Sequence, residues 1–208
     1  YYLHGDNSLS NSLNIYGFSE DDITDVFLTH LHFDHCGGSV KWNNDKTGFD
    51  MAFKNAKYWS NNDHWSHALN SNYREKASFL KDNIIPIQQS GQLNFIERDS
   101  KFFDFFNVLF VDGHTESQMI PHIKYKNQTI VFAADLLPST GHIPLAYVMG
   151  YDTQPLKTLI EKKQFLLDAA EKQYVIFMQH DNYNECCTVK LSEKGVVLDK
   201  TFKLTDIL

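Results

Sequence analysis

The sequence is poor in the features that mark several classes of protein. It has 3 cysteines in 208 residues, which gives no disulfide framework of the kind found in small secreted domains. The 19 Lys and Arg residues stand against 26 Asp and Glu, a net charge of −7 without a basic run, so nucleic acid is not an expected partner. No apolar stretch is long enough to cross a bilayer and no secretory leader is recognisable, so no membrane partner is expected either.

The few cysteines favour a reducing compartment, and the predicted location is therefore the cytoplasm. Cys186 and Cys187 are neighbours, and a disulfide between neighbours is strained and rare. Cys36 stands beside a group of histidines. It is either a metal ligand or, as is more common for a free thiol, a small buried side chain.

The length and composition are typical of one globular domain with a substantial core, because 42% of the residues are hydrophobic and 22% are charged. We therefore predict a single domain over residues 1–208. Within it, residues 54–80 resemble broken helical segments and are interpreted as an aromatic-rich helical insertion. Its aromatic side chains either form a lid over an apolar substrate or pack on the core. His64 and His67 in this stretch are interpreted as surface or lid residues.

Four short apolar runs have the aromatic or β-branched composition of β-strands. They are ITDVFLT (23–29), FFNVLFV (105–111), TIVFAA (129–134) and YVIFMQ (174–179). Each run is followed by a potential metal ligand, and these ligands are, in order, His30, His114, Asp135 and His180. This shared position at strand ends is the strongest pattern in the sequence and predicts a common role for the four side chains.

Helical patterns separate the strands. A short helix is expected at 19–23, where a serine offers an N-cap ahead of acidic residues. From Pro155 onward, apolar residues at helical spacing predict a longer amphipathic helix, with Asp152 or Thr153 as its cap. The chain ends in a predicted hairpin that turns at residues 193–195. Strands interspersed with helices indicate a layered α/β fold.

The stretch THLHFDHCGG (29–38) places three histidines and an aspartate within six positions. In an extended segment His30 and His32 point the same way, so they can hold one cation from one side. A turn then lets Asp34 and His35 face a neighbouring position, and the two glycines permit an abrupt course of the backbone. Imidazole and carboxylate groups are the ligands expected of zinc, manganese or iron.

The ligands at the later strand ends complete the set that two metal ions need. About six to seven protein ligands hold two ions if each ion keeps a position for water. The local motif supplies four, and His114, Asp135 and His180 supply three more. Taken alone, either histidine is an ordinary loop residue and Asp135 a helix N-cap, but the histidine cluster strengthens all three. We therefore expect two divalent metal ions, zinc in first place, with manganese or iron as alternatives.

These motifs carry a family resemblance. HLHFDH at 30–35 is the H-x-H-x-D-H signature of the metallo-β-lactamase fold superfamily, and GHT at 113–115, AAD at 133–135 and QH at 179–180 are similar to its later motifs. Residues 135–180 most resemble the branch that contains acyl-homoserine lactonases and methyl parathion hydrolase. The resemblance implies an αβ/βα four-layer sandwich of the α/β class, with a dinuclear site at the edge of two sheets.

The resemblance also implies how the ligands divide. One ion is held by His30, His32 and His114, the second ion is held by Asp34, His35 and His180, and Asp135 bridges the two. The implied enzyme is a metal-dependent hydrolase in which a metal-bridging hydroxide, steadied by Asp34 or Asp135, attacks an ester, lactone or phosphotriester. His142 is the candidate for a substrate contact or a donor to the leaving group, and the alternative is a loop histidine beside Pro144.

The chain departs from the family pattern in three places. Many relatives have proline and a second histidine after GHT, where this chain has Glu116 and Gln118, and neither is expected to be a ligand. Pro138 stands where the homoserine lactonases typically have a tyrosine, which weakens that particular assignment. Family members carry several strands before the first motif, whereas 29 residues precede His30, so we expect that the chain lacks an N-terminal portion.

Other functions share part of this pattern. A thioesterase similar to glyoxalase II carries the same signature. A di-iron redox protein similar to the flavodiiron proteins is less favoured, because those proteins have a carboxylate at the position of His32 and usually a flavin domain. A metal-binding module without catalysis is disfavoured by the complete ligand set. The expected partner is therefore a small-molecule substrate, and a homodimer is one candidate assembly.

Overall fold

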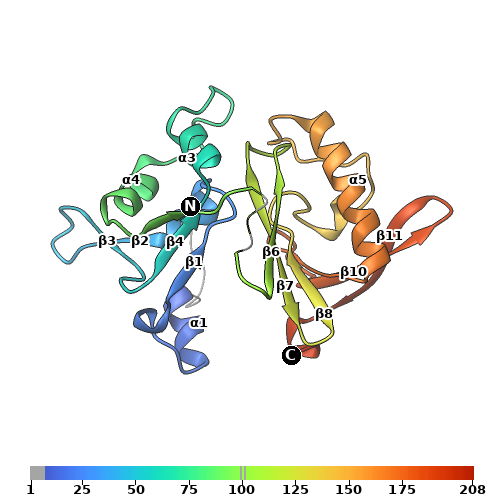
Figure 1. Cartoon of the computed structure of the whole chain (residues 1–208), viewed down its shortest axis with the longest axis horizontal. Helices are drawn as coiled ribbons and strands as arrows, with labels where there is room; N and C mark the ends of the chain where they lie inside the picture. Colours follow the sequence, from blue (N-terminus) through green and yellow to red (C-terminus); the bar gives the residue numbers. More distant parts are fainter. Residues whose placement is uncertain (1–7, 99, 101) are drawn as a thin grey trace. The chain divides into compact units, whose positions relative to one another are not determined.

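The computed structural model describes residues 8–208 except 99 and 101. It divides into two compact units, which meet in the sequence between Glu97 and Arg98. Each unit contains strands and helices, so the predicted mixed α/β class is confirmed (Figure 1). The expectation about the start of the chain falls in part on residues 1–7, which lie outside the described residues.

The first unit is built on a three-stranded parallel sheet with the strand order β1–β4–β5. An antiparallel pair, β2 and β3, forms a second small sheet. The elements are α1 (Leu9–Ile15), η1 (Glu20–Asp22), β1 (Asp25–Phe27), α2 (Phe33–Cys36), η2 (Gly37–Ser39), β2 (Val40–Trp42), β3 (Phe49–Met51), β4 (Lys57–Ser60), α3 (Asn62–Leu69), α4 (Lys81–Gln89) and β5 (Leu93–Phe95). The predicted first strand and the short helix after Ser19 are both present.

The aromatic stretch 54–80 begins with strand β4 and continues with helix α3, whereas helices alone were expected. β4 forms because Tyr58 and Ser60 are buried on alternate positions of a short run that pairs on both sides. The Tyr58 hydroxyl donates a hydrogen bond to the carbonyl of Ser39 at 3.2 Å, and Trp65 of α3 is buried in the same core. These two aromatic side chains therefore pack the core and form no lid, whereas Tyr73 is 98% exposed.

The second unit is a six-stranded sheet with the order β11–β10–β9–β8–β7–β6. Neighbouring strands are antiparallel except β8 and β9, which are parallel and are joined through helix α5. The elements are β6 (Phe106–Val111), β7 (Gln118–Tyr125), β8 (Gln128–Phe132), η3 (Thr140–His142), α5 (Pro155–Lys172), β9 (Val175–Phe177), β10 (Cys186–Ser192), β11 (Gly195–Phe202) and η4 (Leu204–Asp206). The predicted C-terminal hairpin is β10–β11, and its turn is closed by Gly195 with φ of +100°.

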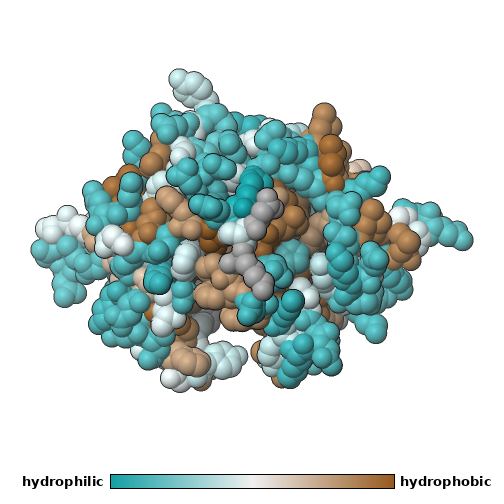
Figure 2. Space-filling model, in the orientation of Figure 1, coloured by the Kyte–Doolittle hydropathy of each residue, from teal (hydrophilic) through white to brown (hydrophobic). Residues whose placement is uncertain are grey.

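Helix α5 lies along one face of this sheet, where it contacts β10 and β11 (Figure 1). Its buried face carries Phe165, Leu166 and Ala169, which join strand residues such as Val131 and Ile176 in one core cluster. Hydrophobic atoms also remain at the surface over α5 (Figure 2). In the described part of the chain, no helix combines the length and the apolar character needed to span a membrane.

Candidate metal centre

The predicted metal ligands fall into two groups, one in each unit. The N-terminal set consists of His30, His32, Asp34 and His35. It comes shortly after β1, where the backbone amide of Leu28 still donates a hydrogen bond to the carbonyl of Trp59 on β4 at 3.0 Å. His30 and His32 are buried, and a ring nitrogen of His30 lies within 4.8 Å of a ring nitrogen of His32. Asp34 and His35 lie on α2, where a carboxylate oxygen of Asp34 is 3.5 Å from Nε2 of His35.

The turn that separates the pair His30 and His32 from the pair Asp34 and His35 is helical. α2 begins directly after His32, and η2 continues it, so Asp34 and His35 are offset from the extended pair before them. The two glycines do not supply left-handed backbone, since neither has a positive φ. A Cβ at Gly37 would lie 3.2 Å from Nδ2 of Asn83 on α4, so the small residue serves close packing against that helix.

A buried carboxylate supports His32. Glu75 is 3% exposed, and its Oε2 lies 3.5 Å from Nε2 of His32. Its Oε1 lies 3.0 Å from Nε2 of His67 and accepts a hydrogen bond from the side-chain amide of Asn72 at 2.8 Å. A carboxylate at one ring nitrogen of a histidine fixes the orientation of the ring and leaves the other nitrogen for a metal ion.

His64 supports the backbone between the first two predicted ligands. Its Nε2 accepts a hydrogen bond from the backbone amide of Leu31 at 2.8 Å, so this nitrogen carries no proton. The ring is fully buried, and the N-cap Asn61 holds the start of α3 in place. The expectation that His64 is a surface or lid residue is wrong, because its ring is fully buried. His67 is partly buried, with its side chain 15% exposed, and contacts Glu75.

The C-terminal set consists of His114, Asp135 and His180. His114 follows β6 and is buried. Its Nε2 lies 3.1 Å from Oδ2 of Asp135, and its Nδ1 lies 3.0 Å from Oδ1 of Asp152. Burial by itself would lower the pKa of His114, but the two carboxylates outweigh it and raise the pKa to about 9.

Asp152 has a different role from the expected one. Helix α5 begins at Pro155 with Gln154 as its N-cap, so Asp152 does not cap it, and the predicted cap was wrong. The Asp152 side chain is 1% exposed and instead contacts the ring of His114.

Asp135 comes directly after a sharp change of backbone direction. Ala134 has a φ of +42°, in the left-handed region, and no helix begins at Asp135, so it is not an N-cap. With its amide oriented so that the oxygen faces this turn, Gln118 accepts hydrogen bonds from the amides of Asp135 (3.1 Å) and Leu136 (3.2 Å). The fully buried Gln118 of β7 thus holds the backbone that presents the carboxylate.

His180 lies beyond the end of β9, and its backbone amide donates a hydrogen bond to the carbonyl of Pro138 at 3.0 Å. Its Nε2 lies 3.2 Å from Oδ1 of Asp135. Because Oδ2 of the same carboxylate faces His114, the two oxygens of Asp135 address two different imidazoles. Within the second unit, the structure therefore brings all three predicted residues together.

His142 lies at the end of η3, where its Nδ1 is 2.8 Å from the hydroxyl of Ser139. Burial, and then the nearby charge of Lys162, lower the pKa of His142. Its carbonyl oxygen accepts a hydrogen bond from the Lys162 ammonium at 2.9 Å. The role predicted for this histidine at the substrate stays a prediction.

Lys162 is a residue that the sequence pattern does not single out. It is 1% exposed on the buried face of α5, and its ammonium also donates to the carbonyls of Pro144 (3.3 Å) and Tyr147. Burial lowers the pKa of Lys162 to about 8. The lysine therefore binds three backbone carbonyls and fixes the loop that carries His142.

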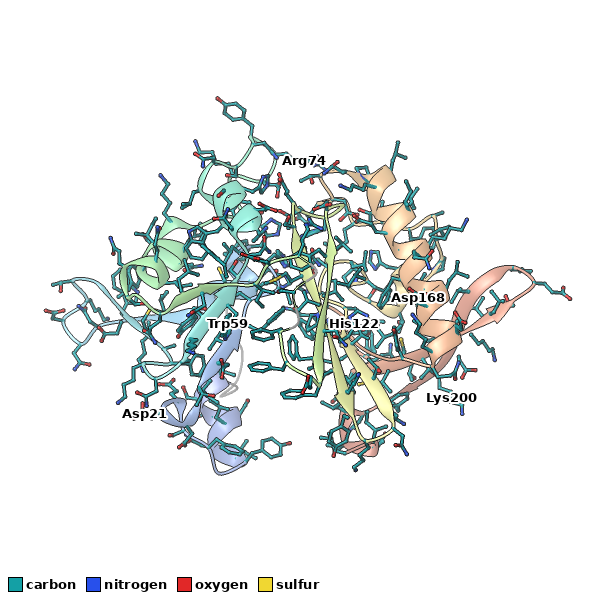
Figure 3. The ribbon with its side chains drawn as sticks, viewed as in Figure 1. Asp21, Trp59, Arg74, His122, Asp168 and Lys200 are labelled. Carbon is teal, nitrogen blue, oxygen red and sulfur yellow. The ribbon has the colours of Figure 1, made fainter. Side chains whose placement is uncertain are left out.

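A histidine and a cysteine lie outside both sets. The ring of His122 on β7 packs against Phe165 of α5 and against Tyr174, with ring centroids 6.3 and 5.3 Å apart (Figure 3). Cys36 is buried, its thiol donates to the carbonyl of Leu31 at 3.3 Å, and burial raises the pKa of the thiol to about 12. Cys36 is therefore a buried protonated thiol, which is the commoner of the two expected roles.

The donors of both sets suit a first-row divalent metal ion. They are imidazole nitrogens and carboxylate oxygens without thiolate, which is the ligand chemistry of zinc, manganese or iron sites. His32 and His114 each have a carboxylate at the other ring nitrogen, the usual partner of a metal-bound imidazole. The residues present thus fit the metal ions that the sequence predicted.

The chain belongs to the metallo-β-lactamase superfamily, whose family model matches residues 8–180. The predicted class of enzyme, a metal-dependent hydrolase of this superfamily, is therefore confirmed. None of the curated proteins compared with the chain is similar enough to count as a match.

Solved structures share the fold over 94% of this chain. A probable metal-dependent hydrolase from Staphylococcus aureus is 24% identical, is covered over 69% of its length and gives a TM-score of 0.79. AidC, a dizinc quorum-quenching lactonase solved with its product, is 26% identical, with 70% of its length covered and a TM-score of 0.76. The hydrolase AbOPH of the β-lactamase superfamily is 21% identical, with 70% covered and a TM-score of 0.77. The metallo-β-lactamase fold predicted from the motifs is confirmed.

Proposed function

We propose that the chain hydrolyses a small ester, lactone or phosphotriester at a centre of two divalent metal ions. The observation that carries this proposal is the carboxylate of Asp135, whose oxygens face Nε2 of His114 and Nε2 of His180. A carboxylate that faces two imidazoles in this way suits a bridge between two cations, each of which takes one oxygen. Asp135 is also 4% exposed, so its carboxylate is not a solvated surface group.

The proposed ligand assignment follows the family resemblance. One ion takes His30, His32 and His114, the other takes Asp34, His35 and His180, and Asp135 is shared. Glu75 and Asp152 are proposed to orient the rings of His32 and His114 through their second nitrogens. The two sets together supply seven side chains, which leaves room for water if each ion is four- or five-coordinate.

Two bound divalent cations supply Lewis acidity, which makes water nucleophilic near neutral pH. Side chains of the protein are proposed to orient the water and the substrate. Asp34, 43% exposed, is accessible to solvent and accepts a hydrogen bond from the attacking water. His142 is proposed to contact the substrate or to donate a proton to the leaving group, from a loop that Lys162 holds in place. No serine or cysteine nucleophile is needed, and the buried thiol of Cys36 takes no part.

The substrate class is proposed from the relatives. AidC is described as a lactonase with a bound product and AbOPH as a hydrolase, and both share the fold with this chain. Pro138, where homoserine lactonases typically have tyrosine, argues for a substrate other than an acyl-homoserine lactone. A small-molecule partner, zinc as the metal, a homodimeric assembly and a cytoplasmic location stay predictions.

The proposal is tested by elemental analysis together with a substrate panel. We expect about two equivalents of zinc, manganese or iron per chain and turnover of lactones or organophosphates. Glutathione thioesters serve as the comparison, because turnover of these alone would assign a thioesterase instead. A protein without stoichiometric metal, or with metal and no hydrolysis of any member of the panel, would contradict the proposal.

The supporting role of Glu75 makes a separate prediction. Glu75→Gln keeps the shape of the side chain but removes the charge beside His32, so the affinity for zinc should fall by about 10–100-fold. The measurement is a competition titration of zinc against a chromophoric chelator. Glu193→Gln, at the exposed turn of the β10–β11 hairpin, is the matched control and should leave the affinity unchanged. A variant whose metal-free form melts earlier while its zinc affinity is unchanged would show a purely structural role.

A further inference from the structure

The second unit contains an apolar cavity that takes no part in the proposed reaction. Its volume is about 460 Å³, within the usual range for a small-molecule site. Three segments line it: η3 with the loop that follows it, one side of α5, and the β10–β11 turn with the start of β11. The apolar part of the wall is formed by Ile143, Leu145, Leu166, Leu167, Val196 and Leu198. None of the predicted metal ligands is among the lining residues.

Two lysines are the only charged residues in this lining. Lys163 comes from α5 and Lys194 from the turn before β11. Among the described residues, neither ammonium has a carboxylate partner. Some other lysines of the unit do form ion pairs, for example Lys172 with Asp168 at 3.5 Å and Lys190 with Asp199 at 2.9 Å. In a chain with a net charge of −7, two unpaired lysines beside one apolar cavity indicate an anionic ligand.

Helix α5 continues this surface beyond the cavity. Leu156, Ile160, Lys163 and Leu167 recur at helical spacing on its outer side, and Leu156 and Ile160 are 77% and 71% exposed. Figure 2 shows hydrophobic residues at the surface over α5, and Leu156 and Ile160 are exposed residues of this helix. A helix that carries a solvent-facing apolar stripe interrupted by one lysine is suited to an alkyl chain with a charged head.

The loop that forms one wall is held rigidly. Thr140 donates two hydrogen bonds to Asp181, from its amide at 3.0 Å and from its hydroxyl at 2.7 Å. Lys162 binds the carbonyl of Pro144 from the other side. The cavity is therefore preformed, which reduces the entropy lost when a ligand binds.

We propose that this cavity binds the monomeric anion of a single-chain aliphatic carboxylic acid. The alkyl chain lies along the apolar wall between α5 and β11, and the carboxylate accepts hydrogen bonds from Lys163 and Lys194. The walls match this ligand because most of the lining residues are apolar, and the charged ones are two lysines without an aspartate or glutamate among them.

The test is a fluorescence titration of the purified, zinc-loaded protein with 11-(dansylamino)undecanoic acid. Saturable binding at one site per chain is expected, with displacement by dodecanoate and much weaker displacement by dodecanol. In the double variant Lys163→Gln, Lys194→Gln the dissociation constant should rise by about tenfold. The matched control is Lys172→Gln, Lys200→Gln, which removes the same charge outside the lining and should bind as the unmodified protein does.

Several results would overturn the proposal. One is the absence of saturable binding, and another is an equal loss of affinity in both double variants, which would indicate a general charge effect. Binding that is lost in His114→Ala but kept in the Lys163, Lys194 variant would place the probe at the metal centre. Sedimentation with vesicles of phosphatidylglycerol without binding of free dodecanoate would identify a membrane surface as the ligand. Circular dichroism of each variant shows whether it is folded.

Discussion

Replacement of Asp135 by alanine is expected to remove at least one metal ion per chain and to lower turnover by on the order of 10³-fold, about 4 kcal/mol of activation free energy. The cause is the position of the carboxylate between two imidazoles, 3.1 Å from Nε2 of His114 and 3.2 Å from Nε2 of His180. Without it the two histidines have no common anion, and the positive charge of the ions is less well compensated. Elemental analysis and kcat on the best substrate of the panel measure both effects.

The control for this prediction is Asp168→Ala on α5. Asp168, labelled in Figure 3, forms a surface ion pair with Lys172 at 3.5 Å. This variant therefore also loses one carboxylate and should keep metal and activity. His114→Ala should resemble Asp135→Ala, since it removes a neighbouring ligand of the same set. Unchanged metal content and turnover in both Asp135→Ala and His114→Ala would refute the proposed centre. Thermal unfolding of chelator-treated samples separates loss of a ligand from misfolding.

The candidate ligands could be predicted from the sequence because they are tied to local patterns. His114, Asp135 and His180 each follow a short apolar run that becomes a strand, and strand ends carry side chains to one edge of a sheet. The spacing of His30 and His32 likewise depends only on the extended backbone after β1. Neither inference needs knowledge of distant contacts, which is why both could be made in advance.

The supporting residues could not be found in the same way. Glu75 contacts His32 across 43 positions of the chain, and Asp152 contacts His114 across 38, so no local spacing links either pair. In the sequence Glu75 stands in a polar stretch typical of a solvent-exposed loop, and Asp152 stands where a helix cap is common. The sequence therefore offered a local role for Asp152, the helix cap, and no signal of its contact with His114.

Helix α5 shows how an apolar pattern can indicate the helix and yet misplace its buried face. Apolar residues from Leu156 to Ala170 predicted an amphipathic helix, and α5 is present, but Leu156 and Ile160 face solvent. The buried stripe instead includes Thr158 and Lys162. A lysine is tolerated there because three backbone carbonyls accept its hydrogen bonds, a partner set that only the folded loop provides.

Alanine at Gly113 is expected to destabilise the protein by about 3 kcal/mol, which corresponds to a fall in Tm of about 6–12 °C for a chain of this size. A Cβ at this position would lie 2.5 Å from the backbone nitrogen of Thr158 and 2.6 Å from its Cα. These atoms belong to the first turn of α5. The backbone amide of Gln154, the N-cap of α5, also donates a hydrogen bond to the carbonyl of Gly113 at 2.8 Å. The backbone amide of Gly113 donates a hydrogen bond to the carboxylate of Glu161, also on α5, at 2.9 Å.

The same change should also weaken metal binding, because α5 cannot move away from Gly113 without displacing Asp152 from His114. Thermal unfolding and zinc titration of Gly113→Ala measure the two effects. Gly150→Ala is the control, since nothing lies within 4 Å of a Cβ there. Thr158→Ala added to Gly113→Ala should restore little, because it removes the hydroxyl but leaves the backbone in place. Full recovery in that double variant, or a Tm equal to that of Gly150→Ala, would show that the contact between Gly113 and α5 is not a tight one.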